Sequence, residues 1–357
     1  MSDNTQIMPG LVVLFGSGET TPSGRKIFEH VFRQLPPQPR VAILETPAGF
    51  ELNSAQVAGR VADFLRQRMK NYQPQIDIVA ARKLGTPNSP DNPEVIAPLW
   101  EADMVFMGPG SPSYATRQLQ GSLAWQIIQA RHRLGMSVTL ASAATVAVGK
   151  YAIPVYEIYK VGEDIHWKEG LNLLGAYELP VVFVPHWNNN DGGEELDTSR
   201  CFMGKARFEP LLEMLPDGIA VVGIDEQTGL LLDLLNGVCR VVGRDGISLI
   251  RGGRGRRFLS GETFAMTEMG DFEYPEPSKD LSLEVWEQAI SAKDILDEPA
   301  APPAKIVELV EKRESARAQK EWEIADDIRE QIRNLGWQVM DTEEGPELEK
   351  VKSISKK

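Results

Sequence analysis

The amino-acid sequence predicts an α/β fold with a doubly wound, mostly parallel sheet, followed by a small C-terminal α-helical hairpin domain. Two observations predict the first part. Strand-like and helix-like segments alternate up to residue 266, which is the pattern of an α/β protein. The strand-like segments are continuous apolar runs rather than alternating ones, which is typical of strands buried on both faces.

The expected elements follow one another along the chain. Residues 54–72 and 122–135 place apolar side chains three or four positions apart, which predicts amphipathic helices. Residues 229–266 contain short apolar segments joined by Gly-rich turns, which predicts antiparallel strands. The apolar runs that predict the other strands lie at residues 11–18, 40–49, 76–81, 102–110, 137–144, 179–187 and 218–226.

The composition changes after the predicted α/β domain, which covers residues 1–266. Residues 267–304 are acidic and contain prolines, which favours a linker. Residues 305–345 have the apolar spacing of two helices, with a break near 319–321 and an end at Gly336. Residues 346–357 form a charged tail.

Composition excludes several classes of protein. The 357 residues are 42% hydrophobic and 25% charged, as in ordinary globular proteins. A net charge of −13 argues against a general nucleic-acid or membrane-surface role. We find no signal peptide and no apolar stretch of ~20 residues. Cys201 and Cys239 form no metal-ligand spacing, so we expect a cytoplasmic protein without a metal.

Ser142 is the candidate nucleophile. It ends an apolar strand, SVTLA, and a helical segment follows at once, which is the arrangement of a nucleophile elbow. The pattern G-x-S-x-G reads here Leu-Ala-Ser-Ala-Ala, so both glycines are absent. The alternative is a serine that caps the next helix through its hydroxyl group.

A serine nucleophile needs a base, and the chain has four histidines. His30 and His132 lie in amphipathic helices. His186 follows the apolar strand 179–185, and active-site residues of open α/β sheets lie at the carboxyl ends of strands. His186 is therefore the best-placed base, with His166 as a second candidate.

A carboxylate would orient the imidazole, and backbone amides would stabilise the oxyanion. Between Ser142 and His186, the sequence offers Glu157, Glu163 and Asp164 as carboxylates, and it does not decide among them. The amide of Ala143 and the turn at Gly110 and Ser111 are candidate oxyanion and substrate contacts.

Taken together, these segments resemble the peptidase E and cyanophycinase family of serine peptidases, whose fold is related to class I glutamine amidotransferases. The resemblance rests on residues 15–19, 108–113, 141–143, 184–186 and 223–228. It implies that Ser142 is the nucleophile and His186 the base, with the acid at Glu157 or Glu163. It also implies a homodimer and aspartyl-containing substrates. The candidate partners for a substrate carboxylate are then Arg117, Lys160, Arg200 and Arg207. The chain differs from the family in its elbow and in Ser111-Pro112, where the family places Asn or Gln after two glycines.

The tail resembles a second family, the cysteinyl-tRNA synthetases. Residues 309–342 are similar to their C-terminal helical module, which in that family lies near the anticodon-binding end. No HIGH-type or KMSKS-type sequence and no zinc-binding cysteines are present, so we do not expect aminoacylation. The tail is expected to dock RNA (tRNA) or a protein partner.

Two functional hypotheses follow. The first is a serine-type exopeptidase or isopeptidase that acts on small peptides without a metal or organic cofactor. The short turn at residues 16–18 supports the absence of a dinucleotide, because Thr21 stands where the fingerprint needs a third glycine. The second is a catalytically impaired, amidotransferase-like binding protein that uses its C-terminal hairpin for docking.

Overall fold

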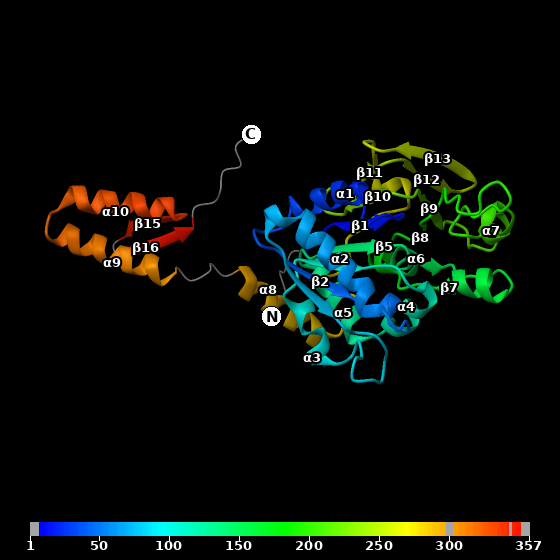
Figure 1. Cartoon of the computed structure of the whole chain (residues 1–357), viewed down its shortest axis with the longest axis horizontal. Coiled ribbons are helices and arrows are strands. Elements are labelled where there is room, and N and C mark those ends of the chain that lie inside the picture. Colours follow the sequence, from blue (N-terminus) through cyan, green and yellow to red (C-terminus); the bar gives the residue numbers. More distant parts are fainter. Residues whose placement is uncertain (1–6, 298–302, 343–344, 351–357) are drawn as a thin grey trace. The chain divides into compact units, whose positions relative to one another are not determined.

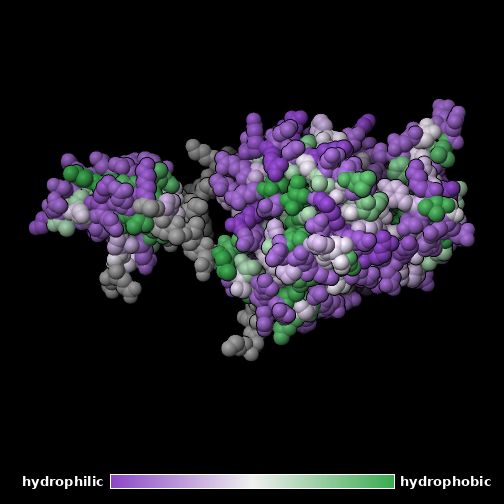
Figure 2. Space-filling model, turned by 60° about the horizontal axis from the view of Figure 1, so that its bottom comes forward, coloured by the Kyte–Doolittle hydropathy of each residue, from purple (hydrophilic) through white to green (hydrophobic). Residues whose placement is uncertain are grey.

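A computed structural model describes residues 7–297, 303–342 and 345–350 (Figure 1). The chain forms two compact units, Met1–Lys293 and Asp294–Lys357. In the described part of the chain, no helix is both long enough and apolar enough to cross a bilayer. Hydrophilic residues cover most of the face shown in Figure 2, and hydrophobic residues form smaller groups on it.

An eight-stranded sheet organises the first unit, in the order β14-β11-β10-β1-β5-β4-β2-β3. The strands β1, β5, β4, β2 and β3 are parallel, whereas β10, β11 and β14 are antiparallel to their neighbours. Their bounds are β1 Val12–Phe15, β2 Arg40–Leu44, β3 Gln75–Val79, β4 Met104–Met107, β5 Ser137–Ala141, β10 Thr228–Asp233, β11 Val238–Gly243 and β14 Thr263–Ala265.

Both faces of this sheet are covered. In β1, Val13 and Phe15 pack in one hydrophobic cluster with residues of α1 and α2, whereas Val12 and Leu14 pack in another with residues of α5. Successive side chains of a strand point to opposite faces, so the continuous apolar runs of the sequence serve both clusters. The α-helices that begin in this unit are α1 Pro22–Phe32, α2 Ser54–Arg68, α3 Pro93–Ile96, α4 Pro112–Leu119, α5 Leu123–Arg133, α6 Ala143–Ala147, α7 Gly204–Glu213 and α8 Leu283–Asp297, and the last four residues of α8 lie beyond Lys293.

A separate four-stranded sheet has the order β13-β12-β9-β8. The sequence reading placed residues 179–187 and 218–226 in the main sheet. They instead form β8 and β9 here, because β8 pairs with β9 in parallel and β9 pairs with β12 on its other side. The bounds are β8 Val181–Val184, β9 Ala220–Ile224, β12 Gly246–Arg251 and β13 Arg254–Leu259, and a two-stranded ribbon adds β6 Tyr151–Ala152 and β7 Lys168–Glu169.

Part of the segment assigned to a linker belongs to the first unit. Met269 and, from α8, Val285, Trp286 and Ala289 are buried in the cluster that contains Val12 and Leu14. Helix α8 therefore has an apolar face, which the acidic and proline-containing composition of residues 267–304 did not reveal. Residues 298–302 of the predicted linker and 351–357 of the predicted tail lie outside the described residues.

The second unit contains two helices and a β-hairpin: α9 Ala304–Ala318, α10 Trp322–Asn334, β15 Trp337–Thr342 and β16 Gly345–Lys350. The two expected helices are present, but the hairpin after Gly336 was not anticipated. Ile306, Ile332 and Trp337 are buried in the small core of this unit. Arg313 holds Asp341 through two hydrogen bonds of 2.9 Å, and this pairing lowers the pKa of Asp341 to about 2.

Gly16, directly after β1, joins the two sheets. Its N–H donates to Thr228 O over 2.9 Å, and its carbonyl oxygen accepts the N–H of His186 over 3.0 Å. A Cβ atom on Gly16 would lie only 1.9 Å from the carbonyl oxygen of Asp225. Glycine is required here because the backbone of one segment lies directly against that of another.

We therefore expect Gly16→Ala to lower the free energy of unfolding of the first unit by about 2 kcal/mol or more, because the backbone around Asp225 must shift. Urea denaturation followed by circular dichroism measures the change. Gly59→Ala is the matched control. It lies in α2 with open space around the added atom, so it should raise stability by about 0.5–1 kcal/mol. Equal effects of the two variants would contradict this explanation.

Candidate active site

Ser142 occupies a sharp turn between β5 and α6. Its backbone has φ 51° and ψ −113°, which is a strained conformation for a residue other than glycine. Within residues 140–144, only Ser142 has a positive φ, so β-carbons at Leu140 and Ala144 are compatible with the turn. The missing glycines therefore do not prevent an elbow from forming. The Ser142 side chain makes no capping hydrogen bond to α6, which excludes the alternative reading of this residue as a cap.

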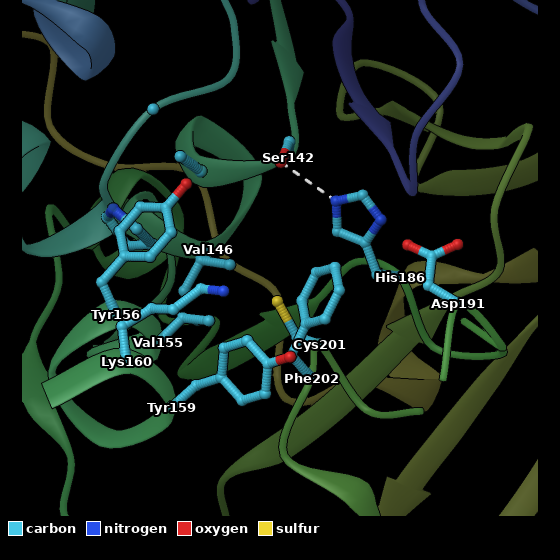
Figure 3. Close-up of a pocket in the computed structure, with 13 residues that line it drawn as sticks. Ser142, Val146, Val155, Tyr156, Tyr159, Lys160, His186, Asp191, Cys201 and Phe202 are labelled. Carbon is cyan, nitrogen blue, oxygen red and sulfur yellow. Dashed lines mark hydrogen bonds between the residues drawn. The ribbon is translucent and has the colours of Figure 1, made fainter. Parts of the chain in front are cut away.

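His186 lies opposite Ser142, just after the end of β8. Its Nε2 atom is 3.0 Å from Ser142 Oγ (Figure 3). The backbone of His186 has φ 52°, and its N–H donates to Gly16 O. The strand end, the positive φ and the bond to Gly16 together aim the imidazole at the serine. The structure thus brings together the two residues that the sequence singled out.

The carboxylate that contacts His186 is Glu226, which follows β9. Its Oε1 atom lies 3.0 Å from His186 Nδ1 and accepts a hydrogen bond of 2.9 Å from the Asn189 amide. The hydrogen bond with His186 is the main cause that lowers the pKa of Glu226 below its ordinary value, so the group is ionised at neutral pH. Asn188 Oδ1 accepts the Glu226 N–H over 2.8 Å and fixes the turn.

The two carboxylates expected from the sequence make other contacts. Glu157 Oε1 is 3.3 Å from Lys168 Nζ, and Glu163 lies 3.9 Å from His166, the second candidate base. The structure therefore corrects the expectation that Glu157 or Glu163 contacts the base. That expectation considered only carboxylates between Ser142 and His186 in the sequence. The signal that could have found Glu226 was its place at the carboxyl end of an apolar strand, the same criterion that selected His186.

Gly110 and Ala143 lie beside Ser142, where an oxyanion would form. Gly110 has φ 147°, and a Cβ atom there would lie 1.9 Å from Pro47 O, so only glycine fits. In the described part of the chain, neither amide group has a hydrogen-bond partner. Two free amides next to a serine hydroxyl group are suited to an oxyanion hole.

Ser111 and Arg117 lie away from this point. Ser111 Oγ accepts the N–H of Tyr114 over 3.2 Å and caps α4, in which Pro112 is the first residue. The Arg117 guanidinium is exposed and lies 5.2 Å from the centre of the Tyr114 ring. Both residues therefore contribute to α4, whose N-terminus positions Gly110.

A cavity of about 360 Å³ opens beside Ser142 and His186 (Figure 3). Its volume is in the range of small-molecule sites. Residues of α6, of the π-helical turn Glu157–Val161 and of the loop after β8 line it. Among the residues that the structure describes, no group of three or more His, Cys, Asp or Glu side chains could hold a metal ion.

Comparisons with known proteins address the fold and the tail separately. The chain superposes on the crystal structure of a peptidase from an acI-B1 Actinobacterium with a TM-score of 0.58 and 20% identity, over 73% of this chain and 98% of the other. The two proteins therefore share a fold. A putative peptidase E protein from Listeria monocytogenes gives a TM-score of 0.43 at 14% identity, over 70% of this chain and 98% of the other. No family model matches the chain.

The C-terminal region matches cysteine–tRNA ligases. It is 52% identical over 48 residues to that of Methanosarcina mazei and 46% identical over 48 residues to that of Methanosarcina acetivorans. Each match covers 13% of this chain, which spans only about a tenth of the length of these curated relatives.

Cys201 also lines the cavity, but it is buried, and burial raises the pKa of its thiol to about 12. We expect neither Cys201 nor the buried Cys239 to react with iodoacetamide in the native protein at pH 7.5, since thiolate is the reactive form. Mass spectrometry after a timed exposure measures this, and both should react fully in guanidinium chloride. Rapid native alkylation of Cys201 would contradict this expectation and show that its thiol is activated.

Proposed function

We propose that the protein is a serine-type hydrolase that cleaves small peptides or isopeptides, as an exopeptidase does. The observation that carries the proposal is the continuous hydrogen-bonded chain from Ser142 Oγ through the His186 ring to Glu226. This is the arrangement by which a serine is activated for acyl transfer. The shared fold with a peptidase supports the same class of reaction.

The proposed mechanism assigns one role to each group. His186 Nε2 accepts the Ser142 proton while Oγ attacks the carbonyl carbon, and the ionised Glu226 stabilises the imidazolium that forms. The amides of Gly110 and Ala143 donate to the oxyanion of the tetrahedral intermediate. His186 then donates its proton to the leaving amine, and water hydrolyses the acyl-enzyme by the same steps.

The carboxylate at Glu226 replaces the expected Glu157 or Glu163 in this proposal. The aspartyl preference implied by the family resemblance would depend on Lys160, because it alone of Arg117, Lys160, Arg200 and Arg207 lines the cavity. Tighter binding of Asp-Ala than of Phe-Ala would support that preference.

Labelling with a fluorophosphonate probe tests the proposed nucleophile. We expect the probe to modify Ser142 and to fail with Ser142→Ala. His186→Ala and Glu226→Gln should slow labelling about 100-fold or more, because the base is lost or its charged form is no longer stabilised. The rate is read by mass spectrometry of the modified peptide.

Glu157→Gln and Glu163→Gln are the matched controls, and they should label within about twofold of the wild-type rate, since neither residue contacts His186. An unlabelled wild-type protein, under conditions that label a known serine peptidase, would contradict the proposal and favour a catalytically impaired binding protein.

We also propose that the C-terminal unit contacts tRNA. The observation that favours this role is the 52% identity with a cysteine–tRNA ligase over 48 residues. Arg329 and Arg333 lie one turn apart on α10, are exposed and line a surface pocket of about 420 Å³, where phosphate groups could pair with them. Asp326 and Glu330 line the same pocket, so the site is not uniformly basic.

The full chain should bind unfractionated tRNA with a salt-dependent Kd, and a chain ending at residue 304 should not. Arg329→Glu combined with Arg333→Glu should weaken binding about 10-fold or more at 100 mM salt, measured by fluorescence anisotropy. Arg66→Glu combined with Arg68→Glu, on α2 of the first unit, is the charge-matched control and should have no effect. Undiminished binding after truncation would contradict the proposal, and so would absence of binding by the full chain.

A further inference from the structure

The inner wall of the cavity beside Ser142 is mainly apolar and aromatic (Figure 3). Val146, Val155, Tyr159 and Phe202 line it, together with the neutral, buried thiol of Cys201. A charged substrate group packed against these side chains would lose hydration and gain at most the Tyr159 hydroxyl group as a hydrogen-bond partner, which is costly. A large apolar group would instead gain free energy in proportion to the area it buries.

Phe202 is held in place by an unusual backbone. Arg200, Cys201 and Phe202 have φ values of 58°, 59° and 67°, so three successive residues are left-handed. L-residues normally adopt this conformation singly, because the β-carbon then lies too close to the following carbonyl oxygen. The Cys201 N–H donates to His186 O over 3.2 Å, which fixes the turn beside the catalytic pair.

This backbone places an aromatic group between two other rings. The centre of the Phe202 ring lies 5.6 Å from that of His186 and 5.6 Å from that of Tyr159. Such spacings are typical of favourable aromatic contacts. A strained backbone at a pocket wall is a reason to expect a role in ligand binding.

Two charged side chains line the cavity, Lys160 and Asp191, whereas Arg200 turns to Trp187. The Arg200 guanidinium stacks 3.8 Å from the centre of the Trp187 ring and donates to Trp187 O over 2.8 Å. Lys160 is exposed, and its Nζ atom lies 4.6 Å from the centre of the Tyr159 ring. Asp191 is also exposed. The buried lining residues Val146, Val155 and Cys201 carry no charge, so this part of the cavity favours apolar groups.

We infer that the cavity binds a substrate residue with a large apolar side chain, preferably an aromatic one, and that Tyr159 and Phe202 determine this preference. The inference rests on the proposed function for its choice of substrate, a small peptide. It assigns the apolar wall to the side chain next to the scissile bond, and Lys160 is not needed for that recognition.

Binding to a variant that cannot turn over substrate tests the inference separately from catalysis. Calorimetric titration of full-length Ser142→Ala with Phe-Ala, Ala-Ala and Asp-Ala compares the three side chains in one scaffold. We expect the Kd for Phe-Ala to be about 10-fold or more below the other two, because only the phenyl group buries a large apolar area. Tightest binding of Asp-Ala, lost on adding Lys160→Ala, would overturn the inference, and so would equal affinities or no binding of any dipeptide.

Substitutions in the same Ser142→Ala background assign the preference to its residues. Tyr159→Ala should remove most of the advantage of Phe-Ala, whereas Tyr159→Phe should retain it. Val161→Ala is the control, because Val161 lies on the same turn but is 73% exposed and outside the cavity lining. Thermal unfolding checks that each variant is folded. A preference unchanged by both Tyr159→Ala and Phe202→Leu would assign it to other residues and overturn the proposal.

The outcomes separate this inference from the proposed function. Failure of the fluorophosphonate to label wild-type Ser142 contradicts the hydrolase, whatever the dipeptide affinities are. Labelling of Ser142 combined with preferential binding of Asp-Ala leaves the hydrolase in place and overturns only the apolar preference.

Discussion

The backbone of Gly16, through its N–H and its carbonyl oxygen, is the constraint on which the candidate site depends. Its N–H bonds to Thr228 at the start of β10, and its carbonyl oxygen bonds to the N–H of His186 at the end of β8. One short segment thereby sets the spacing between the main sheet, which carries Ser142, and the second sheet, whose strand ends carry His186 and Glu226. The 1.9 Å approach of a Cβ to Asp225 O leaves no room for any other residue.

The three residues of the candidate site share a second feature, which is a residue with a positive φ at or beside each strand end. Ser142 has φ 51°, His186 has φ 52°, and Gln227, directly after Glu226, has φ 54°. Each such residue costs roughly 1–3 kcal/mol, and the surrounding packing must hold it in place. Because the positive φ turns the backbone, a side chain there points outward from the edge of a sheet and not along one of its faces. The strain therefore falls where the geometry of the site requires it.

The sequence alone predicted those parts of the structure that depend on residues close together in the chain. Continuous apolar runs predicted the strands, and the small residues around Ser142 predicted the turn. It was insufficient where the outcome depends on which strands pair. Residues 179–187 and 218–226 have the same apolar character as the strands of the main sheet, so nothing in their composition shows that they form a second sheet. The carboxylate was missed for a related reason, because Glu226 reaches His186 only through the pairing of β8 with β9.

The proposed reactivity and the proposed selectivity depend on different segments of the chain. Ser142, His186 and Glu226 lie at strand ends, and the register of two sheets fixes their mutual distances. Tyr159 and Phe202 belong instead to the turn Glu157–Val161 and to the loop after β8. The loop contacts His186 through the Cys201 N–H and the Phe202 ring, and Tyr159 packs on Phe202. A substitution in those two segments changes the wall of the cavity without moving a strand. Two proteins with this fold could therefore share one reaction and differ completely in the side chain they accept.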